Sequence, residues 1–336
     1  MIITEKLASM PLDSPSIVNL HHLISTTIKD EQHSLVFDSN QGLECVLNGY
    51  HERVRKTVEN LILASIRSSS TYTSSRSTIK VDQVENSTWD EPVPVLKLED
   101  ALNVINEKVI ILLENSENDW NFLLGIMKQR DRERILKYAE SGWVEPVHGG
   151  GDSLGRILES EGKKQWKALR TFVLFDSDRL HPDEFNLDWT PERVGQQPSS
   201  CHAFGWEACV KQYFRDRYWM LKRRFIESYM PRDELILAAE NKTDSNAVKF
   251  FFEMDQNARW YYNMKAGLEK DRKRADSERS RDLFSGLSDE ALKSLSTGFG
   301  NTIARHYKQS IGREFSWDMD ARQEADIVLP KLLNLL

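Results

Sequence analysis

Two short runs of aliphatic and aromatic residues, Lys108–Leu113 (KVIILL) and Thr171–Phe175 (TFVLF), constrain the fold of this chain most strongly. Each has the length and the composition of a strand that is buried on both faces of a parallel sheet. Trp143–Val147 predicts a further strand, and the stretches Trp120–Gln129 and Leu154–Glu161 between these runs have helical spacing. The alternation of strand and helix predicts an α/β fold with a mostly parallel sheet flanked by helices.

The segments on either side of this predicted sheet indicate mostly helical structure. Apolar residues recur at helical spacing in Tyr50–Ile66, and the hydroxyl-rich run Ser68–Thr78 that follows is interpreted as a linker. Val95–Leu98 predicts a short strand, and the chain from about Asp233 onward has the charged faces of surface helices. We therefore expect a mainly helical region with its linker over 1–78, a sheet domain over 79–231 and a helical region over 232–336.

Charge and composition limit the class of protein. The chain has 45 Lys and Arg residues against 52 Asp and Glu residues, a formal net charge of −7, so any contact with nucleic acid must come from local basic patches. The longest apolar runs are too short to cross a bilayer, and the first ten residues do not have the pattern of a secretory signal. Three cysteines are too few for a disulfide framework. We expect a cytoplasmic protein with no membrane association.

Acidic residues follow the two most apolar predicted strands. Glu114 comes directly after the first, and Asp176 and Asp178 come after the other. Because ligands bind at the carboxyl ends of parallel strands, and side chains at i and i+2 point the same way, we expect these carboxylates to converge. A hard divalent cation with oxygen ligands, Mg²⁺ or Mn²⁺, would relieve their repulsion. The three residues are therefore predicted as metal ligands and catalytic residues for phosphoryl transfer or phosphodiester hydrolysis.

The order of these motifs resembles the TOPRIM domain, which is shared by topoisomerases, primases and OLD-family nucleases. The matching positions are Glu114 in ILLENSEND, the turn Gly149–Gly151, and Asp176 and Asp178 in FVLFDSDR. The resemblance covers roughly Val93–Pro231.

A later segment, LKRRFIESYM (Leu221–Met230), is similar to an OLD-like segment in which a glutamate follows a basic pair. This similarity implies that Glu227 is a ligand of a second metal ion. Asn115 stands where the family has a glycine after the first glutamate.

Basic residues accompany the acidic set. Tyr213–Tyr229 is predicted to be a helix, and its bases are interleaved with aromatic residues, a combination that suits a phosphate backbone and stacked bases. Arg179 lies beside the aspartate pair and could clamp a phosphate. The predicted substrate-binding residues are Arg179, Lys222, Arg223 and Arg224. The mixed-charge run Lys265–Arg281 is interpreted instead as a solvated helix face.

The resemblance implies a Mg²⁺-dependent nuclease, an endonuclease acting on DNA or RNA, and a role as a toxic effector in bacterial anti-phage defence. The chain has no G-x-x-x-x-G-K-[ST] motif, so we expect a separate ATPase subunit as a partner, with a homodimer as the other assembly. Two alternatives stay open. One is a non-catalytic TOPRIM-like interaction or sensor subunit, which Asn115 favours; the other is a metal-dependent glycosyltransferase that uses the aspartate pair of FVLFDSDR.

Overall fold

The chain is an α/β protein with two four-stranded parallel sheets and many helices. The computed structural model describes residues 1–30, 33–71, 77–90, 92–195, 197, 201–239, 245–272 and 282–336. Contacts within the chain divide it into two units. The first unit comprises residues 1–109, 164–170 and 333–336, and the second comprises 110–163 and 171–332. Residues 79–109 thus belong with the N-terminal helices, and most of the C-terminal region belongs with the sheet that carries Glu114.

The first unit is built on a sheet of two-residue strands in the order β2-β1-β3-β4. Neighbouring strands are parallel, with Ile2 opposite both Val36 and Lys80, and Lys80 opposite Val95. The strands are β1 (Ile2–Ile3), β2 (Val36–Phe37), β3 (Lys80–Val81) and β4 (Val95–Leu96). The helices are α1 (Glu5–Ala8), α2 (Ile17–Asp30), α3 (Asn40–Asn48), α4 (Glu52–Thr71), α5 (Leu98–Asn106) and α9 (Gln165–Ala168).

The second unit contains the two strands that the apolar runs predicted. Its sheet has the order β6-β5-β7-β8, with β7 pairing in parallel with both β5 and β8. All five residues of β7 are buried, because helices cover both faces of the sheet. The strands are β5 (Val109–Leu113), β6 (Val144–His148), β7 (Thr171–Phe175) and β8 (Tyr218–Met220).

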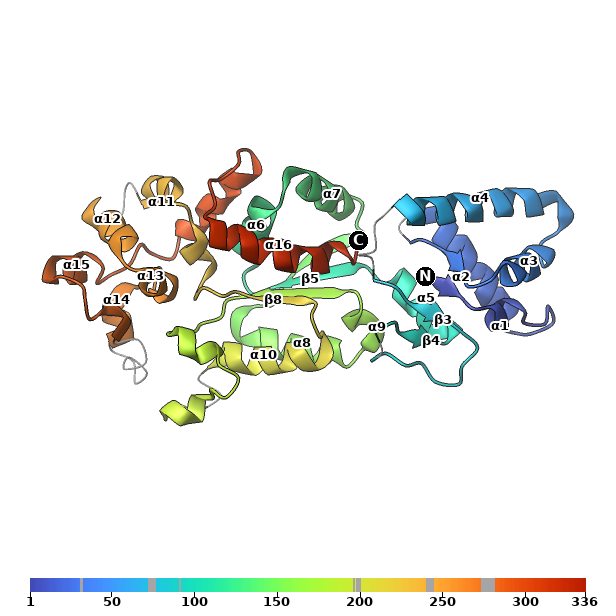
Figure 1. The fold of residues 1–336 in the computed structure, drawn as a ribbon, viewed down its shortest axis with the longest axis horizontal. Coiled ribbons are helices and arrows are strands. Elements are labelled where there is room, and N and C mark those ends of the chain that lie inside the picture. The colour runs from blue at the N-terminus through green and yellow to red at the C-terminus, as the bar shows by residue number, and fades with distance from the viewer. Residues whose placement is uncertain are drawn as a thin grey trace. The chain divides into compact units, whose positions relative to one another are not determined.

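Helices pack on both faces of the second sheet. In Figure 1, α6 (Ser116–Ile126), α7 (Gln129–Glu140) and α16 (Met319–Leu333) lie on one face, and α8 (Leu154–Gly162) and α10 (His202–Tyr213) lie on the other. The 3₁₀ turns η2 (Pro182–Phe185) and η3 (Pro191–Val194) precede α10. The remaining elements are η1 (Gly151–Ser153), η5 (Ile226–Tyr229), α11 (Arg232–Ala239), α12 (Ser245–Glu253), α13 (Gln256–Tyr261), α14 (Gly267–Arg272), η7 (Asp282–Phe284), α15 (Asp289–Ser294) and η8 (Ile303–Ile311).

Several expectations about elements were wrong. The predicted helix over Tyr213–Tyr229 does not form; the chain there makes the strand β8 and the turn η5 instead. β8 has three residues and takes its backbone partners from β7, so no local periodicity marks it. The expected linker Ser68–Thr78 is helical as far as Thr71, where α4 ends, and residues 72–76 lie outside the described residues.

Among the described residues, no helix has both the length and the apolar composition needed to span a bilayer.

Candidate metal centre

The tips of β5 and β7 bring Glu114 and Asp176 together. From β5 the chain runs outward to β6 on one side and then returns to β7 on the other, so the topological switch point lies between β5 and β7. The crevice at such a point is where open parallel sheets bind ligands. Glu114 and Asp176 directly follow the two strands, and the Asp176 amide donates to Glu114 Oε2 at 3.2 Å.

The first turn of α6 adds a third carboxylate. Asp119 is 4% exposed, and its Oδ2 accepts a hydrogen bond of 2.7 Å from the amide of Asn115, the residue that precedes the helix. The positive end of the helix dipole favours a negative charge at this position. The helix therefore places Asp119 directly beneath the tip of β5, close to Glu114.

The turn η5 adds a fourth carboxylate. The Ile226 amide donates to Asp176 Oδ1 at 3.0 Å, and the Ile226 carbonyl accepts from the Tyr307 hydroxyl at 2.7 Å. These two bonds fix η5 between the end of β7 and η8. The next residue, Glu227, is 2% exposed, and its Oε2 has no hydrogen-bond partner among the described residues. A buried carboxylate oxygen without a partner is costly, so this atom points to a missing donor or cation.

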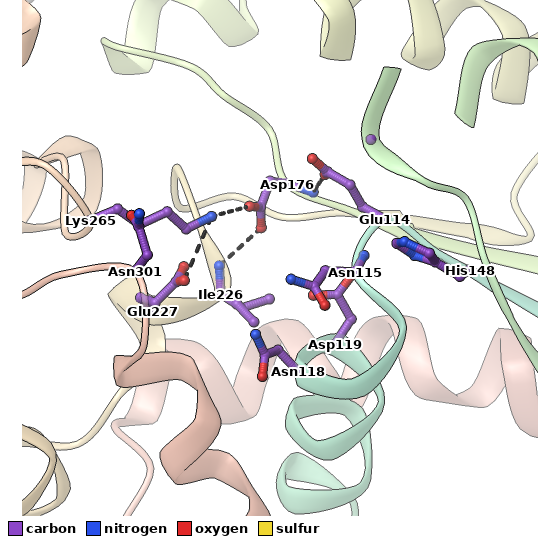
Figure 2. A pocket seen from close by; sticks show the side chains of 11 residues that line it. Glu114, Asn115, Asn118, Asp119, His148, Asp176, Ile226, Glu227, Lys265 and Asn301 are labelled. Carbon is purple, nitrogen blue, oxygen red and sulfur yellow. Dashed lines mark hydrogen bonds and ion pairs between the residues drawn. The ribbon is translucent and has the colours of Figure 1, made fainter. Parts of the chain in front are cut away.

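Lys265, in the loop between α13 and α14, is the counter-charge. Its Nζ lies 3.4 Å from Asp176 Oδ2 and 3.6 Å from Glu227 Oε1. Figure 2 shows the ammonium group between these two carboxylates, with Asn301 beside it. Among the described residues that line the site, Lys265 is the one lysine or arginine facing several acidic groups, so the negative charge of the cluster is only partly neutralised.

These side chains surround a cavity of about 360 Å³. Figure 2 shows carboxylates from two strand tips, a helix and a turn around it. Its lining residues are Glu114, Asn115, Asn118, Asp119, His148, Gly151, Asp176, Ile226, Glu227, Lys265 and Asn301.

Burial and mutual repulsion shift the ionisation of the whole cluster. Burial raises the pKa of Glu114 well above its usual value, and the charges of Asp176 and Asp178 raise it further. Burial likewise raises the pKa of Asp119 strongly and that of Asp176 to about 7. The pKa of Glu227 is also raised, again chiefly by burial.

The pKa of Lys265 is also raised, which favours the charged form of a lysine. Burial would lower the pKa of Lys265, but the carboxylates of Asp176 and Glu227 outweigh burial and raise it. The lysine therefore stays charged at neutral pH, while the surrounding carboxylates compete for protons. These carboxyl groups resist ionising together because their charges repel one another. A bound cation would remove that repulsion and favour their ionised forms.

The donor chemistry of this cavity fits a hard divalent cation. It offers carboxylate oxygens from Glu114, Asp119, Asp176 and Glu227, amide oxygens from asparagines, and the unpartnered Glu227 Oε2. The described part of the chain nevertheless contains no group of three or more His, Cys, Asp or Glu residues spaced as a ready-made metal site. The ammonium of Lys265 lies between Asp176 and Glu227, so binding a cation would require these side chains to readjust.

The raised pKa values predict how stability depends on pH in the absence of metal. Between about pH 4 and pH 7 the folded chain holds the proton of Asp176 more tightly than the unfolded chain does. We therefore expect this group's contribution to the free energy of unfolding to fall as pH rises, by at most about 1.4 kcal/mol per pH unit. Urea unfolding in EDTA at several pH values measures this slope. For Asp176→Asn, the free energy of unfolding should fall less steeply with rising pH than it does for the wild type. Equal slopes for the two chains would contradict the raised pKa.

The predicted metal ligands do not all reach the cavity. Glu114, Asp176 and Glu227 line it together, whereas Asp178 is exposed and is not among the lining residues. Asp178 adopts φ 53°, a left-handed conformation, so its side chain does not continue the alternation of a strand. Its amide donates to the Arg224 carbonyl at 3.2 Å.

The predicted glycine turn supports one edge of the cavity. The Gly149 amide donates to the Leu113 carbonyl at 2.6 Å. A Cβ at Gly149 would approach the same carbonyl to 3.0 Å and a methyl of Leu154 to 2.6 Å. Only glycine therefore lets the tip of β6 lie this close to the end of β5.

The four predicted substrate-binding residues have different surroundings. Arg224 is 1% exposed and forms a two-pronged ion pair with Asp271, with distances of 2.6 and 3.0 Å. Arg179 is buried, contacts Glu207 at 2.8 Å and lies 4.7 Å from the ring centroid of Trp189.

Of the other two residues, Lys222 is exposed to solvent and Arg223 lies at a second cavity. The Lys222 side chain is exposed, and its amide donates to Glu324 Oε1 at 2.9 Å. Arg223 lines a separate cavity, which is described below. We assign Arg179 and Arg224 structural roles, because each guanidinium is buried against a carboxylate and neither lines either cavity.

Sequence reasoning missed Asp119, Asn118, Lys265 and Asn301. Asp119 could have been found, because it lies in the first turn of the helix that follows Glu114. Lys265 was assigned to a solvated helix face together with the rest of Lys265–Arg281, of which residues 273–281 lie outside the described chain. No sequence signal marks Lys265 or Asn301, since both reach the cavity only through the packing of the C-terminal segments.

No family model, curated protein or solved structure matches this chain at a significant level.

Proposed function

We propose that this chain is a TOPRIM-like, Mg²⁺-dependent nuclease that hydrolyses phosphodiester bonds in DNA or RNA. The observation that carries the proposal is the convergence of four carboxylates, from β5, α6, β7 and η5, at the switch point of a parallel sheet. The pKa values of all four are raised, and one buried carboxylate oxygen among them has no partner. These features favour a cation site that takes phosphate oxygens as further ligands.

Glu114, Asp176 and Glu227 would hold the metal, with Asp119 beside them and Mn²⁺ as the alternative ion. When bound, the ion would polarise a phosphodiester and lower the pKa of a water molecule. Glu114 would act as general acid or base, because burial and the neighbouring carboxylates raise its pKa. Lys265 would favour the ionised forms of Asp176 and Glu227 through its two contacts, until a cation takes its place between them.

The biological setting proposed is that of a toxic effector in bacterial anti-phage defence, acting in the cytoplasm. The resemblance to OLD-like and stand-alone TOPRIM proteins supports this role. Because the sequence has no nucleotide-binding P-loop motif, a separate ATPase subunit would restrain or trigger the nuclease. A second copy of the chain is the other partner that we consider.

Cleavage of labelled single-stranded DNA, duplex DNA and RNA by the purified chain tests the proposal. We expect one of these polymers to be cut in Mg²⁺ or Mn²⁺ and none in EDTA. If the chain cuts none of them in either metal, alone or with its genomic neighbours, the nuclease proposal fails. Hydrolysis of a nucleotide sugar instead would favour the glycosyltransferase.

A non-catalytic interaction subunit is the second candidate, and the position of Lys265 favours it. A lysine between two buried carboxylates neutralises them without any metal, which suits a purely structural cluster. In that case Mg²⁺ would change neither the stability nor the activity of the chain.

Binding of Mg²⁺ should stabilise the second unit if the cavity is a metal site. A ligand that binds only the folded state adds about 2.7 kcal/mol at a concentration about 100 times its Kd. We expect the unfolding temperature to rise with Mg²⁺ but not with KCl at the same ionic strength. Glu227→Gln should remove most of the shift, because it replaces the buried carboxylate that has an unpartnered oxygen. A shift that persists in this variant would place the ion elsewhere.

A further inference from the structure

A second cavity, of about 280 Å³, lies on the other side of η5. Consecutive residues of this turn face different cavities: Glu227 lines the acidic one, and Ser228 lines the second. The second cavity is rich in arginine and aromatic side chains. Its lining includes Arg223, Ser228, Arg232, Phe252, Arg259 and Trp260.

Arg223 is a fixed positive charge in the wall of this cavity. It is 4% exposed, and its NH1 donates to the Ser228 carbonyl at 2.8 Å. Its guanidinium lies 4.5 Å from the ring centroid of Tyr229 and 5.1 Å from that of Trp260. Stacking on aromatic rings holds the guanidinium in one place, so it is already oriented before any ligand arrives.

Two buried donors of this cavity have no hydrogen-bond partner among the described residues. One is Ser228 Oγ, in a residue that is 5% exposed, and the other is Arg259 Nε. Buried polar atoms without partners cost free energy, so a site that leaves two of them unsatisfied is suited to an incoming acceptor. Arg232 extends this edge toward solvent, and its guanidinium lies 5.7 Å from the ring centroid of Phe252.

The two acidic residues of the cavity already have partners. Asp318 Oδ1 accepts from Arg223 NH2 at 2.6 Å and from the Ala321 amide at 2.9 Å. Asp320 Oδ2 accepts from Gln256 Nε2 at 2.7 Å. Three arginines against two aspartates leave a formal charge of +1, and neither Arg232 nor Arg259 forms an ion pair within the described chain.

We propose that this cavity binds a phosphate group of a nucleic-acid backbone, with a neighbouring base against Phe252 or Trp260. Arginine forks and hydroxyl donors match phosphate oxygens, and aromatic rings stack bases without regard to sequence. The shared wall η5 would put this phosphate next to the strand segment held in the acidic cavity. The choice of nucleic acid as the ligand rests on the proposed function, whereas recognition of a phosphate group rests on this cavity alone.

The test measures binding without catalysis. A fluorescent single-stranded 12-nucleotide DNA and the same sequence in RNA are titrated with the intact chain in EDTA, and anisotropy reports the Kd. Arg259→Gln should weaken binding of the preferred polymer about tenfold. The slope of log Kd against log salt concentration should become shallower by the equivalent of about one phosphate contact. Arg232→Gln, at the exposed edge of the same cavity, should weaken it less and provides a variant whose folding is not at risk. Arg130→Gln, an exposed arginine on α7, is the matched control and should bind as the wild type.

Equal Kd values for the wild type, Arg259→Gln and Arg232→Gln would overturn the proposal, as would a chain that binds neither oligonucleotide. The chain could instead bind inorganic phosphate or ATP at this cavity without releasing any bound oligonucleotide. That result would overturn the nucleic-acid assignment and leave a site for a small phosphate ligand. If binding is lost in Arg259→Gln while the wild type cuts nothing in Mg²⁺ or Mn²⁺, alone or with its genomic neighbours, the second cavity stands and the nuclease proposal fails. The two proposals can therefore fail separately.

Discussion

Replacing Asp176 with asparagine should lower the rate of metal-dependent cleavage by about a thousandfold, which corresponds to about 4 kcal/mol of transition-state stabilisation. Asp176 lies at the centre of the cluster: its carboxylate contacts both the Ile226 amide and Lys265, and its amide contacts Glu114. Asparagine has nearly the same shape, so the backbone contacts survive and the loss is one of negative charge. The measurement is the single-turnover cleavage rate in saturating Mg²⁺, with folding checked by circular dichroism.

Asp178→Asn provides the comparison that separates the structure from the sequence motif. Both aspartates belong to the FVLFDSDR segment, and the sequence predicts equal roles for them. In the structure only Asp176 lines the cavity, while Asp178 is exposed. We expect Asp178→Asn to reduce cleavage far less than Asp176→Asn does. Equal losses in the two variants would mean that Asp178 turns inward when the metal binds, contrary to the arrangement described above.

Asp271→Ala should destabilise the second unit by about 3–5 kcal/mol, because it leaves the buried Arg224 guanidinium without its counter-charge. The pair is a two-pronged one, and Asn263 Nδ2 also donates to Asp271 Oδ1 at 3.1 Å. Asp271 lies in α14, the helix that follows the loop of Lys265. Its loss should therefore also weaken the placement of Lys265 in the acidic cavity.

Urea unfolding measures the Asp271 effect, and two further variants show its origin. The double variant Arg224→Met/Asp271→Leu should recover much of the stability, since apolar side chains replace both buried charges. Glu159→Ala removes an exposed carboxylate of α8 that contacts Lys163, and it should leave the unfolding midpoint unchanged. An Asp271→Ala chain as stable as the wild type would show that Arg224 finds another partner or water.

The elements that sequence reasoning located best are those that many consecutive residues define. The predicted strand Thr171–Phe175 coincides with β7, and the run Lys108–Leu113 contains β5, because both strands are buried on both faces and consist almost wholly of apolar residues. The sheet of the first unit has strands of only two residues, and β8 has three. Such strands exist through backbone pairing with distant segments, so among them the local pattern predicted only β4, as part of Val95–Leu98.

The residues of the candidate site also differ in how well the sequence predicts their position. Glu114 and Asp176 could be placed together because each ends a strand, and parallel strands end at one edge of a sheet. Glu227 was found only through a resemblance. Arg224 and Arg179 were predicted to bind substrate, but packing buries them against Asp271 and Glu207. A sequence does not reveal which carboxylate a given arginine will meet.

The amino-acid sequence by itself determined the parallel sheet of the second unit and the acidic character of its edge, because hydrophobic burial and strand direction act over a few consecutive residues. Only the tertiary structure decided which charges share the cavity. It brought Lys265 and Asn301 to the carboxylates and left Asp178 exposed, outside the lining of the cavity. The physical reason is that electrostatic interactions depend on distance and burial in space, which are set by the packing of segments far apart in the chain.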